Sequence, residues 1–377
     1  MSITINKLIE YCLQNNVEFA TYRLPGTSKP VTMIVLNTEP KTGFEMFCND
    51  KSTGFVIAPF SDSSSPAVKL IPDLIIEGSV INSSVLNKIP INKNGNKYLN
   101  QAEKESTKTN YVKIFNEIKK HVDSGSVKKV VLSDTLEMDQ LSHCHSALLY
   151  QRLLHLYPDA FVYIINSKHA GTWIGATPET LVSSNNGSFR TMALASTQSY
   201  REGEKITWHH KDIEEHEYVR SFIKYRLKKL NIKQIDEGKT ENSRAGKIVH
   251  LKTVFRGNSD SVSPLEIALQ LHPTPAVCGT PTEKAKELIL KTEKHNRQYY
   301  TGFLGPIFYK QSSDLFVNLR CAKLDTTKTV LFAGGGIVKE SLPEKEWEEI
   351  QLKYNTLLLP MNQTSCEEKS KDKKYAS

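Results

Sequence analysis

The sequence predicts a mixed α+β fold in which strands outnumber helices. Short runs rich in Val, Ile, Leu, Phe and Thr alternate along the chain with segments whose apolar residues recur every three or four positions. Such interleaving favours β-sheets that pack against helices. The clearest example is the segment 315–358, where two strand-like runs (315–322 and 329–332) precede an amphipathic helix that begins after Pro343.

The remaining elements follow from the same two periodicities. Helical spacing of apolar residues predicts helices over 5–13, 111–122, 147–156, 213–230 and 264–271. A further helix is expected after 280, with Thr280 as N-cap, Pro281 as its first residue and Glu283 closing a capping box. Apolar runs predict strands over 17–24, 54–60, 69–77, 127–136, 160–166, 172–176 and 189–195.

Two segments lack such patterning. Residues 79–109 are rich in Asn, Ser and Lys, which predicts an exposed loop or linker and the only internal boundary candidate. Residues 363–377 are charged and contain few apolar side chains, so a disordered tail is expected there.

Composition limits the class of protein. The 377 residues are 39% apolar and 24% charged, which is typical of a globular protein, and no apolar run approaches the roughly 20 residues of a membrane span. The N-terminus has no basic segment followed by an apolar core, so no signal peptide is expected. The six cysteines are scattered without a CxxC pair, which favours reduced thiols in the cytoplasm over disulfides or a zinc site.

The net charge of +8 does not identify a nucleic-acid-binding protein. The basic residues are interspersed with 41 acidic ones, and no basic stripe with interleaved aromatic residues is present. A mildly basic surface also suits a small anionic substrate. We therefore expect neither a nucleic-acid nor a membrane partner.

Several polar residues stand where a structural and a functional interpretation are both open. Arg320 lies inside a strand-like run and needs a partner or an anionic ligand if it points inward. Glu349 and Lys353 are four residues apart on a predicted helix. They could form an ordinary surface ion pair or belong to a functional site. Glu215 faces the buried side of its helix, where a carboxylate either binds a metal or interacts with the helix dipole. The glycines at 334–336 mark a sharp turn or a close backbone approach.

A series of motifs then resembles one family. In order they are KVVLS (129–133), ATPETLV (176–182), ALAST (193–197), EEHEYV (214–219), LHPTPAVCGTP (271–281), RQYYTGFLGP (297–306), NLRCAKL (318–324) and LFAGGGIV with EWEEIQLK (331–353). These resemble the chorismate-utilising enzymes, which include isochorismate synthase, salicylate synthase, anthranilate synthase component I and aminodeoxychorismate synthase component I. The resemblance covers residues 110–358 densely and 1–109 only loosely, at GFVIAPF.

The resemblance implies one large catalytic domain over 1–362, built from two packed β-sheets flanked by helices, with a Mg²⁺-dependent site for the dianion chorismate. By the same resemblance Glu215 and Glu349 are the Mg²⁺ ligands, and Arg320 grips a substrate carboxylate. The other residues that the resemblance places against the substrate are Lys353, His272, Ala195, Thr197 and a glycine turn formed by Gly334, Gly335 and Gly336. Oxygen ligands and a planar guanidinium suit a hard dication and a carboxylate, respectively.

The resemblance also assigns two proton-transfer residues. Lys129 resembles the base that activates water, and Glu179 the acid that protonates the leaving hydroxyl. Their structural alternatives are a solvated strand lysine and a loop carboxylate after a proline. In the ammonia-using relatives a glutamine occupies the position that matches Lys129, and an amidotransferase supplies the ammonia. In aminodeoxychorismate synthases a lysine typically occupies the position that matches Ala195.

Water chemistry without an amidotransferase partner is therefore expected, and the HPTPAVCG motif favours isochorismate synthase. The alternatives are salicylate synthase, which also eliminates pyruvate, and a non-catalytic chorismate-binding subunit. The product would enter menaquinone, siderophore or salicylate synthesis. Two residues depart from the family pattern: Ser196 stands where many relatives have glycine, and Gln198 where arginine is frequent.

Overall fold

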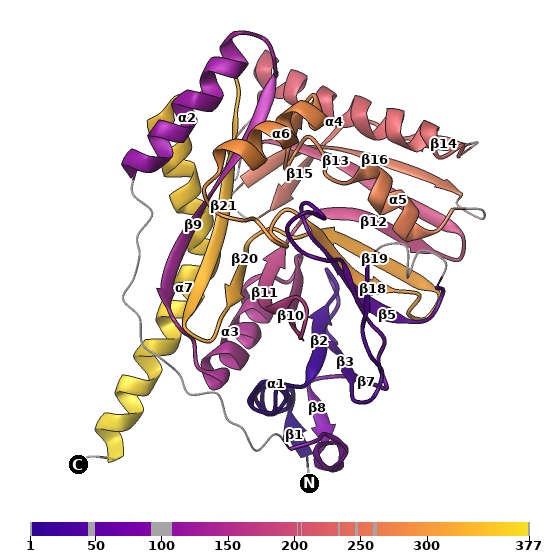
Figure 1. Cartoon of the computed structure of the whole chain (residues 1–377), viewed down its shortest axis with the longest axis vertical. Helices are drawn as coiled ribbons and strands as arrows, with labels where there is room; N and C mark the ends of the chain where they lie inside the picture. The colour runs from indigo at the N-terminus through magenta and orange to yellow at the C-terminus, as the bar shows by residue number, and fades with distance from the viewer. Residues whose placement is uncertain are drawn as a thin grey trace.

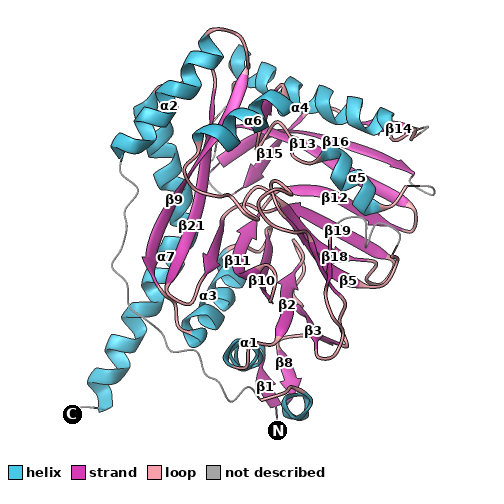
Figure 2. Ribbon diagram, viewed as in Figure 1, coloured by secondary structure: helices cyan, strands magenta, loops and turns pink. Residues whose placement is uncertain are grey.

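Two large antiparallel sheets packed face to face, with helices on both outer sides, form the fold (Figures 1 and 2). The computed structural model describes residues 2–43, 50–91, 108–201, 203–204, 206–232, 234–245, 248–258 and 262–375. This arrangement confirms the predicted α+β fold of two packed sheets flanked by helices.

The first sheet has nine strands within the described residues. Their order is β17 (Gly279–Thr280), β9 (Lys129–Asp139), β21 (Lys328–Ile337), β20 (Cys321–Leu324), β11 (Gly171–Thr177), β10 (Phe161–Ser167), β2 (Glu18–Arg23), β3 (Val31–Val35) and β7 (Leu74–Glu77). A separate two-stranded sheet pairs β1 (Ser2–Thr4) with β8 (Val80–Asn82).

The second sheet has ten strands, nine of them along its main path, again within the part of the chain that the structure describes. Their order is β14 (Ile235–Glu237), β16 (Ile248–Asn258), β13 (Ser188–Ser199), β12 (Thr180–Asn185), β19 (Ser312–Val317), β18 (Phe303–Ile307), β5 (Gly54–Ala58), β6 (Val68–Leu70) and β4 (Lys41–Thr42), with β15 (Glu241–Ala245) also paired to β16.

Aromatic side chains fill the space between the sheets. Phe161 of β10 stacks on Phe316 of β19 with ring centroids 4.2 Å apart, and Tyr22 of β2 lies 5.6 Å from Phe55 of β5. All four side chains are buried. Because burying one such ring stabilises a fold by about 1.5–3 kcal/mol, these contacts fix how the sheets face each other.

Helices cover the two outer faces separately. The face of the nine-stranded sheet packs against α1 (Ile5–Gln14), α2 (Lys108–Asp123), α3 (His143–Leu156), α6 (Thr282–Thr292) and α7 (Pro343–Tyr375). The ten-stranded sheet packs against α4 (His210–Lys229) and α5 (Pro264–Leu271). A 3₁₀-helix spans Ser83–Lys88. No helix among the described residues combines the length and apolar character required to cross a membrane.

Most predicted helices have bounds within a few residues of those observed, because each carries a clear apolar face. The helix after 280 differs. Thr280 belongs to β17, where it pairs with Lys129, so α6 begins at Thr282 with Pro281 as its N-cap and without a side-chain cap. The predicted N-cap was therefore wrong by one residue: pairing with β9 holds the Thr280 backbone extended.

Two further differences concern the C-terminal part of the chain. The run 315–322 is divided between β19 and β20, since Arg320 adopts a positive φ of 49° between them. The glycines at 334–336 are not a turn, because β21 continues through them and pairs with β9.

The segments without patterning also contain structure. Part of the expected loop 79–109 forms β8 and the 3₁₀-helix, and residues 92–107 lie outside the described residues. Helix α7 extends to Tyr375 and so includes most of 363–377, whose Glu and Lys residues have favourable helix propensity.

Candidate active site

A cleft of about 1070 Å³ gathers most of the sequence-predicted site residues. Its lining comes from segments far apart in the chain. They include Lys129 at the start of β9, Glu179 before β12, Ala195 in β13, Glu215 in α4, Arg320 between β19 and β20, Gly334 and Gly336 in β21, and Glu349 and Lys353 in α7. Charged groups of both signs thus face one another in a single space.

Lys129 and Glu215 form an ion pair inside this cleft. The Lys129 Nζ lies 2.6 Å from Oε1 of Glu215, and the lysine is only 3% exposed. The glycine at 336 makes room for the lysine: a Cβ there would lie 2.9 Å from the Lys129 Cε. The lysine is consequently buried and directed across the cleft instead of solvated beside Lys128.

Glu179 is a buried carboxylic acid at the same site. Burial raises the pKa of Glu179 to about 7, and the charge of Lys129 opposes this rise. The backbone around it is fixed, because the Glu179 carbonyl accepts a hydrogen bond from Val317 N at 2.9 Å. A carboxyl with this pKa can donate a proton near neutral pH.

Arg320 enters the cleft from the break between β19 and β20. Its positive φ of 49° ends the β19 direction, and its carbonyl accepts a hydrogen bond from Ala176 N at 3.1 Å. The guanidinium donates from Nη1 to Thr356 Oγ1 of α7 at 2.9 Å. The other donors of this planar group make it a suitable partner for a carboxylate in the cleft.

Lys353 connects α7 to the glycine strand. Its Nζ donates to the Gly334 carbonyl at 2.7 Å and pairs with Glu349 Oε1 at 2.6 Å. The Glu349 carboxylate is 52% exposed, so this pair by itself contributes little to stability.

The glycines satisfy three close approaches instead of a turn. A Cβ at Gly334 would lie 2.9 Å from the Tyr300 hydroxyl, and one at Gly335 would lie 3.0 Å from Glu346 Oε2. With the Lys129 contact of Gly336, each position excludes a side chain for a different reason. Gly334 and Gly336 line the cleft, whereas Gly335 faces α7.

The donor set fits a hard divalent cation. Glu215 and Glu349 line the same cleft, and each carboxylate lies 2.6 Å from a lysine ammonium, whose place a cation could take. Within the described residues no group of three or more His, Cys, Asp or Glu side chains could hold a metal ion. Two carboxylates alone leave positions for water and for a substrate carboxylate, as Mg²⁺ prefers.

Besides Gly335, two predicted site residues are not part of this lining. His272 donates from Nε2 to the Pro59 carbonyl at 3.1 Å, its ring lies edge-on to Phe303, and burial lowers the pKa of His272 to about 4. Thr197 pairs with His250 through the backbone, and its side chain lies outside the described residues.

Several lining residues were missed from the sequence. They are Lys128, Tyr218, His250, Tyr300, Lys339 and Glu346. Tyr300 lies in the RQYYTGF motif, which could have indicated it. His250 carried no local signal, because a single histidine in a strand more often has a structural role.

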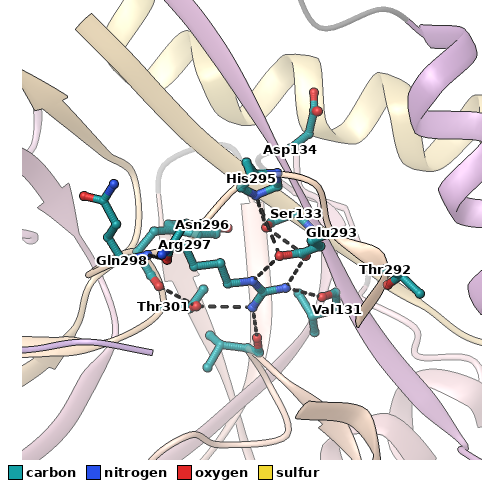
Figure 3. A network of polar contacts seen from close by, with 12 residues as sticks. Val131, Ser133, Asp134, Thr292, Glu293, His295, Asn296, Arg297, Gln298 and Thr301 are labelled. Atoms are coloured by element: carbon teal, nitrogen blue, oxygen red, sulfur yellow. Dashed lines mark hydrogen bonds and ion pairs between the residues drawn. The ribbon is translucent and has the colours of Figure 1, made fainter. Parts of the chain in front are cut away.

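Behind β9, a buried network holds the cleft wall (Figure 3). The Arg297 guanidinium forms a bidentate pair with Glu293, with Nη2 to Oε1 at 2.6 Å and Nε to Oε2 at 2.8 Å. It also donates to the carbonyls of Val131 and Val277 and to Thr301 Oγ1. These three residues line the cleft, so the network connects three segments of its lining.

Glu293 extends the same network to the next residues. Its Oε1 accepts from Ser133 N at 2.7 Å and from Ser133 Oγ at 2.9 Å, while Ser133 Oγ lies 2.9 Å from His295 Nε2. A buried charge pair whose remaining donors and acceptors are satisfied makes the backbone of β9 rigid near Lys129.

Comparison with known proteins adds sequence relatives and a shared fold. The family model described as "Chorismate binding enzyme" matches residues 47–361, a range that contains every cleft residue named above. The isochorismate synthase EntC of Escherichia coli K12 is 30% identical over 241 residues, and the match covers 62% of each chain. The isochorismate synthase DhbC of Bacillus subtilis 168 is 29% identical over 257 residues, or 64% of each chain.

These matches span less than two thirds of the length of the curated relatives. A solved structure of MenF, the menaquinone-specific isochorismate synthase from Escherichia coli, superposes with a TM-score of 0.79 at 21% identity, covering 96% of this chain and 94% of that one. At this identity the superposition establishes the fold.

Proposed function

The chain belongs to the chorismate-binding enzyme family, and from this membership and the cleft geometry we propose that it is an isochorismate synthase. The proposed reaction converts chorismate into isochorismate. Water attacks C2 of the ring, the ring double bonds shift, and the 4-hydroxyl leaves as water.

Binding and orientation of the substrate fall to the basic residues. Chorismate carries two carboxylates, and the Arg320 guanidinium offers paired N–H donors to one of them. Lys353, which is anchored on the Gly334 carbonyl, adds a second positive charge on the α7 side of the cleft. Together these residues direct the substrate carboxylates to the α7 side of the cleft.

Lys129 and Glu179 manage the two protons of the reaction. In the proposed step the ammonium of Lys129 first gives up its proton, and the resulting amine accepts a proton from water while the oxygen forms its bond to C2. Glu179 donates a proton to the 4-oxygen as the C4–O bond breaks. One water enters and one leaves, so the reaction needs no oxidant, reductant or second substrate.

Glu215 and Glu349 would hold a Mg²⁺ ion together with water and the other substrate carboxylate. When bound, Mg²⁺ supplies positive charge that fixes this carboxylate and stabilises electron density moving towards the ring. Removal of either carboxylate should weaken cation and substrate binding together.

One observation carries this proposal: a buried carboxyl whose pKa is raised to about 7 and a buried lysine share one cleft with the carboxylates of Glu215 and Glu349. An acid and a base within the same cleft are the groups that hydroxyl exchange requires.

The test is to incubate the purified protein with chorismate and Mg²⁺ and to identify the products by chromatography and NMR. Isochorismate without pyruvate is expected, and chelation of the metal should stop its formation. Salicylate with pyruvate would instead assign an elimination activity, and unchanged chorismate would leave a binding role only.

A further inference from the structure

Ser196 occupies an unusual backbone position in the cleft. The pairing of β13 with β16 shifts register between Ala195 and Thr197, and Ser196 adopts a φ of 60° at this irregularity. The residue is only 6% exposed and lines the cleft. A residue with a Cβ is strained in this left-handed region, which favours glycine, and such strain persists only where the surroundings hold it.

The Ser196 hydroxyl supplies that hold. Its Oγ donates to the Asp212 carbonyl, in the first turn of α4, at 2.6 Å. This bond joins the bulged strand to the helix turn that immediately precedes Glu215. The hydroxyl therefore fixes the position of α4 relative to β13 at the edge of the cleft.

The same hydroxyl also reaches the carboxylate of Glu215. Ser196 Oγ lies 3.4 Å from Glu215 Oε2, while Lys129 Nζ lies 2.6 Å from the other oxygen, Oε1. The two oxygens of this carboxylate thus lie near different elements, β13 and β9; the strong bond of the Ser196 hydroxyl is the one to Asp212, and the approach to Oε2 is a longer contact.

We propose that Ser196 is a positioning residue that orients Glu215 and thereby sets the affinity of the cleft for a divalent cation. The inference rests on the proposed role of Glu215 as a cation ligand. Partners that orient a ligand without touching the metal typically change metal affinity 10–100-fold when removed. Ser196 acts through its hydrogen bond to the backbone of Asp212, three residues before Glu215, and not by contact with the substrate.

The experiment measures Mg²⁺ binding by titration calorimetry, without chorismate, and Mn²⁺ binding by electron paramagnetic resonance. Ser196→Ala and Ser196→Gly both remove the hydroxyl, but only glycine relieves the positive φ. Ser183→Ala is the matched control. Ser183 lies in the adjacent strand β12, outside the cleft, and its Oγ donates to the Asp314 carboxylate at 2.6 Å. Both Ser196 variants should bind the cations about tenfold more weakly, and the control should match the wild type.

Three results would overturn or separate the claims. Wild-type affinity in Ser196→Ala would show that the hydroxyl does not position Glu215. Weak binding in Ser196→Ala with normal binding in Ser196→Gly would assign the effect to backbone strain. Absence of cation binding by the wild-type protein would refute the cation site itself, and with it this inference. Thermal unfolding of each metal-free variant checks that the fold is retained.

Discussion

Replacing Glu179 with glutamine should change stability in a pH-dependent way. Glutamine keeps the size and hydrogen-bonding capacity of the side chain but cannot ionise. Burial raises the pKa of Glu179 from 4.5 to about 7, which corresponds to about 3 kcal/mol at 1.36 kcal/mol per pKa unit. Between these values the folded state binds a proton that the unfolded state has released.

The sign follows from this difference in bound protons. Stability contributed by protonated Glu179 is complete below pH 4.5 and is lost as the pH rises through about 7. The wild type should therefore lose about 3 kcal/mol of unfolding free energy relative to Glu179→Gln across this window. At pH 8 the variant should be the more stable protein, although its turnover is lost.

Urea unfolding at intervals from pH 4.5 to pH 8, followed by circular dichroism on metal-free protein, measures this quantity. Glu241→Gln serves as a control because the Glu241 carboxylate is 60% exposed. Parallel pH dependence in the wild type and Glu179→Gln would show that Glu179 ionises normally, and the assignment of Glu179 as the acid would then fail.

Three further substitutions test the rest of the site. Gly336→Ala places a Cβ 2.9 Å from the Lys129 Cε and should displace the lysine. We expect kcat to fall at least tenfold while the melting temperature changes little. An unchanged kcat would show that Gly336 does not position Lys129. Lys129→Met removes the ammonium that competes with a cation for Glu215. Calorimetry should show about tenfold tighter Mg²⁺ binding, and turnover should be lost. Weaker Mg²⁺ binding would refute this competition. Arg297→Met leaves the buried Glu293 carboxylate unpaired and should cost about 3–5 kcal/mol in urea unfolding; a loss below 1 kcal/mol would show that the pair is not a structural requirement.

Local sequence patterns predicted the elements better than their junctions. The helices at 5–13 and 264–271 carry continuous apolar faces, and the structure has them as α1 and α5. The glycines at 334–336 were ambiguous because turn and close approach demand the same residue type. Their partners Ser133, Leu132 and Val131 lie in β9, about 200 residues earlier, and no local pattern contains that information.

The site shows the same limit more sharply. Spacing alone left Glu215, Glu349 and Arg320 with structural alternatives, and only the family resemblance grouped them. Lys129 and Glu215 are 86 residues apart, and their ion pair depends on β9 and α4 meeting across the cleft. The backbone of Arg320 was unpredictable for a related reason: the run from 315 to 322 contains no Gly or Pro to indicate a break.

The most direct test of the account is to run the reaction in ¹⁸O-labelled water with chorismate and Mg²⁺ and to locate the label by mass spectrometry and NMR. Attack by water predicts isochorismate with one labelled oxygen, on C2, and unlabelled oxygen released from C4. Isochorismate whose C2 hydroxyl carries unlabelled oxygen from the substrate, or no conversion of chorismate in the presence of Mg²⁺, would contradict the proposed roles of Lys129 and Glu179.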